Sequence, residues 1–448
     1  MNRLLIFVLF LLVSTGCSQA DLKSKNEAIP LFGSMEAHQY DFNNGLRLIV
    51  VEDHSSPTFA YQTWFKVGSR NEEPGKTGLA HLFEHMLFKR TQSYGDGDFM
   101  KKLEAVGVEG LNAFTSQDYT AYIQKLPKKY LELIVKLESE RMQNLIVDQK
   151  AFETELAVVK NERQMRSENS PDGRVYEALM TTAYDKHPYS WPIIGFEKDL
   201  ASMKPEDAKE FYQKWYSPNQ AVIIVVGDVN RRTVLKTVDQ YYGKIKPSTI
   251  EPLQIPTEPP QKKIKTKKLK LNVAYEKLVL AFHVPSVNHP DAPVLEVIQA
   301  ILSDGKNSRL TQRLVNTGIA TSVSTGSFQT MDPSIFTFFI DLQKGRRASE
   351  AERIVLEEIE KLKKDLVSNS ELKKAKNLVR FAFFTGVDSS YSIGRFIGSF
   401  EIRTGSFKNG VKLYQEAIPR VTAEDIKRVV KKYFNPSQRT AITGVPRS

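Results

Sequence analysis

A helix–turn–strand pattern occurs twice in this chain, at positions about half its length apart. In residues 207–227, a helical pattern ends at an aromatic pair, turns at Pro218 and continues into an apolar run. Residues 425–444 repeat this order around Pro436, 218 residues further along the 448-residue chain. Self-similarity at a long interval indicates a duplicated structural unit. We therefore expect an α+β fold of two similar halves, each of about 210 residues.

The boundary between the halves is predicted from composition. The length suits two or three domains, and prolines cluster at residues 256–260, which favours an extended linker. We predict a first domain over residues 38–250, a linker over 251–265 and a second domain over 266–448. Within the first domain, apolar patterning predicts strands at 46–51, 59–65 and 221–226 and helices at 78–90, 130–144 and 152–166.

The net charge of +11 is spread along the chain, with 63 basic and 52 acidic residues. There is no arginine-rich arm and no aromatic stripe among basic residues, so nucleic acid is not an expected partner. Lysines are dense over residues 262–270, where some alternate with apolar residues. A solvated strand face explains these lysines better than a binding patch does.

The first 17 residues have the layout of a secretory signal. Arg3 precedes the apolar residues 4–13, a run shorter than the roughly 20 residues that a spanning helix needs. Cys17 follows and is the only cysteine. One interpretation is an ordinary signal peptide that contains a cysteine. We favour the other, a bacterial lipoprotein signal that leaves Cys17 first and lipid-modified, although Ser14 stands where such signals usually have Leu.

This interpretation gives an expected location. Residues 18–37 are polar and mixed and are predicted to be a tether. Ser18, rather than Asp, follows Cys17, which resembles the lipoproteins directed to the outer membrane. We expect a protein of the bacterial cell envelope, anchored to the membrane through lipid, at the periplasmic face of the outer membrane.

The sharpest local pattern is His81-Leu82-Phe83-Glu84-His85. On a helix, His81 and His85 lie one turn apart on one face with Glu84 beside them. Two imidazoles at this spacing can bind Zn²⁺, and a catalytic zinc site has three protein ligands and one open position. Glu84 is then placed to take a proton from water, in the inverted form of the His-Glu-x-x-His pattern. The alternative is a polar helix face with two ordinary histidines.

A third ligand is available from a second helical pattern at residues 152–165. Glu155 and Glu162 are seven residues apart, hence on one helix face at the border of its apolar stripe. Taken alone, these are two solvated carboxylates, which are common on helices.

Together these features resemble the pitrilysin/insulinase family of inverted-motif zinc peptidases, in the two-domain branch with the mitochondrial processing peptidase. In that family a glutamate ligand follows the second histidine after a long spacer, and residues 86–161 fill that spacer before Glu162. The family also has a supporting glutamate seven residues earlier, where Glu155 stands. Further matches are Gly78-Leu79-Ala80, Leu111 to Thr115, His187-Pro188-Tyr189, Pro218-Asn219 and Gly227-Asp228.

The resemblance implies one zinc ion per chain, held by His81, His85 and Glu162, in a chamber between two facing halves with mainly antiparallel sheets. Glu84 is the implied general base and then general acid. Glu155 is implied to support catalysis by orienting Glu84 or a ligand.

The resemblance also implies how a peptide substrate binds. The residues Asn112, Ala113, Phe114 and Thr115 resemble an exposed edge strand to which an extended peptide adds. Without the resemblance, a plain core strand is the simpler interpretation. His187 is interpreted as structural.

The chain departs from the family in its second half. Active single-chain members have an Arg and a Tyr seven residues apart, and here Ala320 stands seven residues after Arg313. Some bacterial members divide the work between a zinc-bearing chain and a metal-free chain with the Arg-Tyr pair. We therefore expect a heterodimer with a sister subunit.

Three functions compete. A zinc metalloendopeptidase acting on peptides or unfolded segments is favoured. The alternatives are a non-catalytic assembly subunit and a peptide-binding lipoprotein with a retained structural zinc site. A structural site normally closes its fourth position with a protein ligand, and the mature chain has no cysteine for that purpose.

Overall fold

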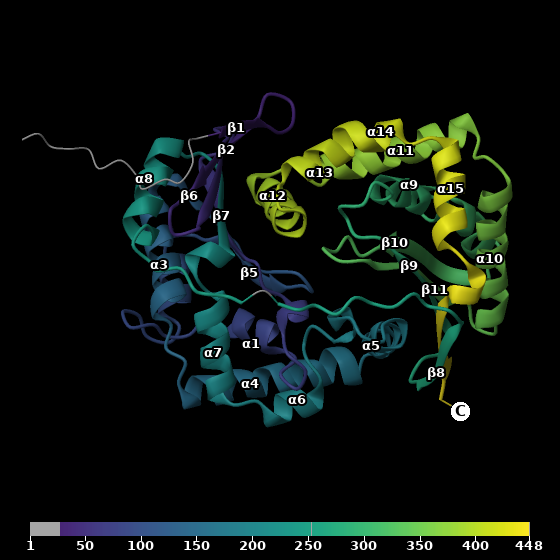
Figure 1. Cartoon of the computed structure of the whole chain (residues 1–448), viewed down its shortest axis with the longest axis horizontal. Helices are drawn as coiled ribbons and strands as arrows, with labels where there is room; N and C mark the ends of the chain where they lie inside the picture. Colours follow the sequence, from purple (N-terminus) through teal and green to yellow (C-terminus); the bar gives the residue numbers. More distant parts are fainter. Residues whose placement is uncertain (1–26, 252, 448) are drawn as a thin grey trace, which may run out of the picture.

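The computed structural model describes residues 27–251 and 253–447, which form two α+β halves joined by a long extended segment (Figure 1). The signal segment, Cys17 and residues 18–26 lie outside the described part. The first half contains β1 Glu27–Pro30, β2 Glu36–Asp41, β3 Arg47–Glu52, β4 Thr58–Phe65, α1 Leu79–Met86, α2 Asp98–Glu104, β5 Glu109–Thr115, β6 Thr120–Pro127, α3 Leu131–Asn144, α4 Gln149–Arg163, α5 Pro171–Ala183, α6 Glu197–Ser202, α7 Pro205–Trp215, β7 Ala221–Gly227 and α8 Arg231–Tyr242.

The second half contains β8 Lys265–Leu271, β9 Lys277–Val284, α9 Ala292–Leu302, β10 Ala320–Ser327, β11 Ser334–Leu342, α10 Ala348–Lys364, α11 Asn369–Thr385, α12 Ser390–Thr404, α13 Lys408–Lys412, α14 Ile418–Arg420, α15 Ala423–Tyr433 and β12 Thr440–Pro446. Among the described residues, no helix is long and apolar enough to cross a membrane.

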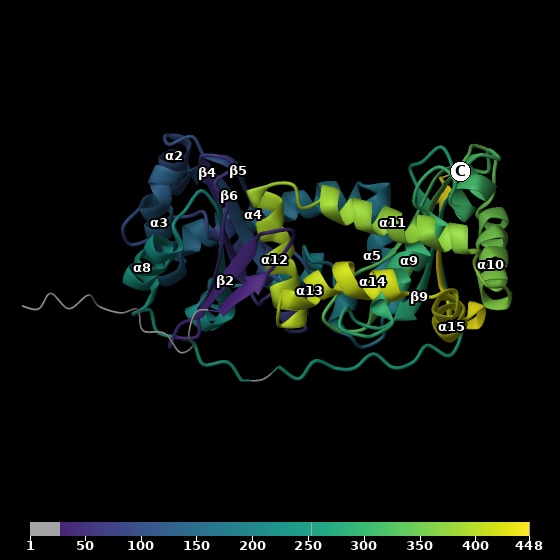
Figure 2. The ribbon, with the colours of Figure 1, turned by 90° about the horizontal axis from the view of Figure 1, so that it is seen from above.

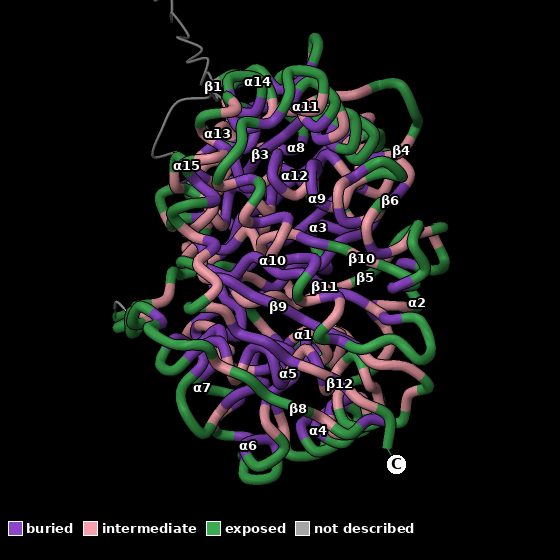
Figure 3. The backbone as a smooth tube through the Cα atoms, turned by 90° about the vertical axis from the view of Figure 1, so that its right-hand side faces the viewer, coloured by how far each residue is buried: buried purple, intermediate pink, exposed green. Residues whose placement is uncertain are grey.

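Five strands of the first sheet, β3-β7-β4-β6-β5, have the same topology as β8-β12-β9-β11-β10 of the second, which confirms the predicted pair of similar halves. The first sheet has the order β1-β2-β3-β7-β4-β6-β5 and the second β10-β11-β9-β12-β8. The repeated pattern supplies β7 and β12, each placed between a parallel neighbour and an antiparallel one. In each sheet the remaining neighbours pair antiparallel. The buried central strands stand out in Figure 3.

One helix of each half packs on the sheet of the other half. Helix α5 precedes the linker, yet its apolar face packs on the second sheet, where Leu179 and Val279 share one cluster. Helix α12 follows the linker, yet it packs on β4 and β7 of the first sheet. Its residues Ile397 and Phe400 share a core with Ile224. The other face of the first sheet is covered by helices of its own half.

The tether is shorter than predicted, because residues 27–30 form β1 rather than part of a polar segment. This strand pairs with β2. Ile29, Leu31 and Phe32 are buried in the core that contains α12, so burial of these apolar side chains anchors the segment. The linker crosses between the halves in extended form (Figure 2). The Glu258 carboxylate holds it by accepting hydrogen bonds from backbone N–H groups of residues 185–187.

Two glycines let α12 approach the first sheet closely. A Cβ at Gly398 would lie 2.1 Å from the Trp64 ring, and one at Gly394 would lie 2.4 Å from the Gln62 amide. Trp64 is itself buried in the shared core. The backbone of α12 therefore packs closely against these side chains at the interface between the halves.

Gly398→Ala is expected to destabilise the protein by roughly 1–3 kcal/mol, because the added methyl group would clash with the Trp64 ring at the interface between the halves. The shift of the urea-unfolding midpoint, followed by tryptophan fluorescence, measures this. Helix propensity alone favours Ala over Gly by about 1 kcal/mol. A variant more stable than the parent would therefore contradict the close approach of α12.

Candidate metal centre

Helices α1 and α4 bring the three predicted ligands together. His81 and His85 lie on α1, and Glu162 lies on α4, which packs against α1. One Glu162 oxygen is 3.8 Å from Nε2 of His81 and 3.4 Å from Nε2 of His85. A ligand atom from each residue lies within 4.8 Å of the others. Within the described ranges, no other cluster of His, Cys, Asp and Glu meets this criterion.

The donor set fits zinc. Two imidazole nitrogens and one carboxylate oxygen are the ligands of many catalytic zinc sites. Burial, together with His85 and Arg166 nearby, lowers the pKa of His81 to about 3, so its imidazole is neutral at pH 7 and has a lone pair to offer. The Nδ1 atom of His81 is buried without a hydrogen-bond partner among the described residues.

Glu84 lies between this cluster and strand β5. Its carboxylate accepts a hydrogen bond of 2.8 Å from the Thr115 hydroxyl. Burial raises the pKa of Glu84, which suits a group that must both take and return a proton. The side chain lines the same hollow as the three candidate ligands.

Glu155 contacts a candidate ligand rather than Glu84. Its carboxylate lies 3.3 Å from Nδ1 of His85 and 2.8 Å from Nζ of Lys89. The hydrogen bond from His85 is the main cause that lowers the pKa of Glu155. A carboxylate on one imidazole nitrogen leaves the other, Nε2, directed to a metal, as in many zinc sites.

The hollow has a volume of about 780 Å³ and is bounded by an open sheet edge. Strand β5 is the last strand of the first sheet, so it is not a core strand, and all four predicted residues, Asn112 to Thr115, line the hollow. The backbone of β5 pairs with β6 on one side only. The arrangement offers an extended peptide a strand edge beside Glu84.

Glu72 supports the helix that carries the two candidate histidine ligands, and it was missed in the sequence. Helix α1 begins after Gly78, which has a φ of 97° and provides no capping side chain. The buried Glu72 carboxylate accepts hydrogen bonds from the backbone N–H groups of Gly78 at 2.9 Å and Ala80 at 2.8 Å. It therefore fixes the first turn of the helix that carries His81 and His85. No local sequence pattern indicates this contact.

Glu72→Gln is expected to weaken zinc binding by about tenfold, because the amide has one acceptor oxygen and turns its N–H₂ toward a backbone N–H. Competition with a chromogenic chelator measures the affinity. Glu73→Gln is the matched control, since Glu73 is the exposed neighbour. Equal zinc affinities in the two variants would contradict a role of Glu72 in supporting the site.

Two other residues singled out in the sequence lie away from the hollow. His187 is buried, accepts a hydrogen bond from the Tyr189 backbone and contacts Asp332 across the halves at 3.1 Å. Its contacts are structural, as predicted. Arg313 contacts α10 through Glu357 at 2.7 Å and Glu358 at 2.9 Å.

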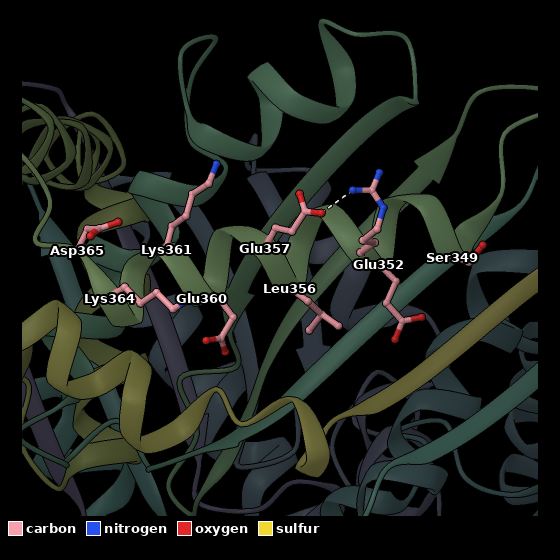
Figure 4. A pocket seen from close by; sticks show the side chains of 9 residues that line it. Ser349, Glu352, Leu356, Glu357, Glu360, Lys361, Lys364 and Asp365 are labelled. Carbon is pink, nitrogen blue, oxygen red and sulfur yellow. Dashed lines mark hydrogen bonds and ion pairs between the residues drawn. The ribbon is translucent and has the colours of Figure 1, made fainter.

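The outer face of α10 has a hollow of about 660 Å³, shown in Figure 4. Its lining comes from α10 and the next residue, Asp365, and consists mainly of Glu, Arg and Lys side chains. Glu357 and Arg353 form an ion pair there. Within this lining there is no histidine or cysteine. The candidate metal ligands lie instead at the hollow beside α1 and β5.

Comparisons with known proteins agree with this geometry. Residues 47–196 match the family described as "Insulinase (Peptidase family M16)", and residues 202–379 match "Peptidase M16 inactive domain". The zinc protease PqqE of Helicobacter pylori is 31% identical over 92% of this chain and 95% of its own length. The chain belongs to peptidase family M16, the two-domain zinc peptidases related to insulinase, which confirms the predicted family.

More distant relatives include an uncharacterized zinc protease, YmxG, of Bacillus subtilis, 26% identical over 87% of this chain and 93% of the relative. The probable mitochondrial-processing peptidase subunit beta of Arabidopsis thaliana is 25% identical over 87% and 75%. Among solved structures, a protease from Helicobacter pylori is 30% identical, with a TM-score of 0.85 over 94% of this chain and all of that one. These relatives support a peptidase and confirm the predicted fold class.

Proposed function

We propose that the protein is a zinc metalloendopeptidase that hydrolyses peptides or unfolded polypeptide segments. The observation that carries the proposal is the convergence of His81, His85 and Glu162 beside Glu84, at the open edge of β5. Metal ligands, a proton acceptor and a strand edge for a peptide thus share one hollow.

Zinc bound by His81, His85 and Glu162 would supply a Lewis acid for the scissile carbonyl and lower the pKa of a bound water. Glu84 takes the proton of the attacking water and delivers it to the leaving amine. The Thr115 hydroxyl orients the Glu84 carboxylate through its hydrogen bond. Glu155 is a positioning residue, because it fixes the ring of His85.

Peptide binding is assigned to β5. An added strand would pair with the unpaired backbone groups of Asn112 to Thr115, which gives affinity with little sequence preference. Thr115 is the β5 residue whose side chain reaches Glu84, so a strand that pairs at this end of β5 has its backbone beside the proton acceptor.

A sister subunit remains part of the proposal. Arg313 is held by two carboxylates of α10 and does not line the catalytic hollow. Ala320, at the start of β10, has no side chain that can hold a substrate. A second chain is therefore proposed to supply the Arg-Tyr pair. The lipid anchor at Cys17 and the periplasmic face of the outer membrane are proposed from the signal segment alone.

The test is cleavage of mixed quenched oligopeptides by the purified chain from Ser18 onward, loaded with zinc. We expect hydrolysis that a chelator abolishes and zinc restores. If one zinc ion binds per chain and no peptide is cleaved, the search turns to a partner that restores activity. If no partner restores cleavage, the alternative stands, a non-catalytic assembly or peptide-binding lipoprotein with a retained zinc site.

A further inference from the structure

A second hollow lies where the two halves meet, close to the substrate strand. It has a volume of about 380 Å³ and is formed by the end of α11, one face of α12 and two aromatic residues of the first half, Trp64 and Tyr119. Two arginines of α12, Arg395 and Arg403, are part of its lining. The proposed peptidase mechanism uses none of these residues.

Phe114 of β5 connects this hollow to the catalytic one. Phe114 is one of the residues that line the catalytic hollow. Its ring also packs against Trp64 at 5.5 Å and Tyr119 at 6.1 Å between centroids. The Arg395 guanidinium lies 5.0 Å from the centre of the same ring. A peptide bound along β5 would therefore have Arg395 within reach of its side chains.

The two arginines differ in how they are held. Arg403 donates hydrogen bonds to the Gln329 carbonyl and to Ser399. Arg395 is exposed, and its guanidinium lies over the Phe114 ring. Within residues 27–251 and 253–447, no carboxylate lies at ion-pair distance from it. Stacking on an aromatic face fixes a guanidinium and leaves its N–H edge free to donate. Arg395 is thus an oriented cation that is not paired with any carboxylate in the described part of the chain.

Strand geometry indicates which substrate side chains would meet Arg395. Successive side chains of β5 point to opposite faces of the sheet. Thr115 points toward Glu84 on the α1 face, whereas Phe114 points to the face covered by α12. A strand added about 4.8 Å beyond β5 would alternate in the same way. Every second side chain of the peptide would then lie on the same face as Arg395. The side chain beside Phe114 would be the one within reach of the guanidinium.

We propose that Arg395 binds a carboxylate of the docked peptide and so makes acidic peptides preferred ligands. The inference rests on the proposed peptide binding at β5 and adds a specificity-determining residue to it. The carboxylate has two possible sources, an Asp or Glu side chain on the face toward α12 or the C-terminus of a short peptide. Both match the planar, bidentate donor geometry of a guanidinium.

The test is binding of fluorescein-labelled peptides to the zinc-loaded Glu84→Gln protein, followed by anisotropy. A polar peptide carries one Glu at each position in turn, against Gln at the same position, with a free or an amidated C-terminus. We expect Glu to tighten binding about tenfold, only at positions an even number of residues apart. Adding Arg395→Gln is expected to abolish this preference, and adding Arg395→Lys to retain part of it.

Arg380→Gln is the matched control, since Arg380 is an exposed arginine on α11 outside the hollow, and it should keep the preference. A preference confined to free over amidated C-termini identifies the terminal carboxylate as the ligand. The inference is overturned if Glu and Gln peptides bind equally and free and amidated C-termini also bind equally, or if a preference survives Arg395→Gln.

The two proposals fail separately. If the zinc-loaded parent protein cleaves neutral peptides and shows no carboxylate preference, the role proposed for Arg395 is refuted and the proposed peptidase activity is supported. If binding shows an Arg395-dependent preference but neither the parent protein nor its complexes cleave peptides, the proposed peptidase activity is refuted. The role of Arg395 in binding acidic peptides then stands.

Discussion

Glu84→Gln is expected to lower kcat for peptide hydrolysis by about 10²–10⁴-fold while zinc still binds one to one. The amide keeps the size of the side chain and its hydrogen bond from Thr115, but it accepts no proton at neutral pH. His81, His85 and Glu162 are unchanged, so the ligand set remains. Quenched-peptide kinetics beside metal analysis of the same samples measures both quantities.

A graded control comes from the residue that orients Glu84. Thr115→Val removes only the hydroxyl that donates to the carboxylate, and a smaller loss of about tenfold is expected. An active Glu84→Gln protein would assign proton transfer to another group. Loss of zinc from that variant would instead show that Glu84 acts in metal binding, so the metal analysis is essential to the interpretation.

Glu162→Gln is expected to weaken zinc binding by about a hundredfold or more, because a neutral amide replaces the one anionic ligand of the set. Substitutions outside the ligand set typically cost about 10–100-fold, so loss of a ligand should cost at least as much. Activity falls with zinc occupancy and returns in part when excess zinc is added. Chelator competition and peptide hydrolysis at several zinc concentrations separate these effects.

Glu153→Gln is the matched control for that variant, since Glu153 is an exposed glutamate on the same helix α4. It should bind zinc and hydrolyse peptides as the parent protein does. Unchanged zinc affinity in Glu162→Gln would contradict the ligand set and would require a different third ligand near α1. Glu155 would be the nearest candidate, as it already contacts His85.

The sequence predicted the repeated halves and the shared helix face of the two histidines because both can be recognised from local patterns. Helical spacing alone places His81 and His85 on one face, and the duplication places β7 and β12 at equivalent positions in their sheets. The pairing of α1 with α4 came from the family resemblance. It is a tertiary contact, and local periodicity says nothing about which helices meet.

The features that were missed depend on long-range packing. Glu72 caps α1 through backbone contacts that leave no pattern of residue types. The apolar residues near Ile29 are too few to indicate a strand, yet they are buried against residues from the far end of the chain. The exchange of α5 and α12 cannot be predicted from the sequence pattern. An amphipathic pattern indicates that a helix buries one face, but it does not indicate which sheet that face covers.

That exchange bears on how the chain arose. A half-length protein with this fold would carry a sheet whose second face its own helix does not cover, since α5 and α12 each cover the opposite sheet. Such a polypeptide would bury that face by trading helices with an identical copy, as domain-swapped dimers do. In evolutionary terms, the chain has the architecture of two helix-swapped protomers that have been joined into one polypeptide.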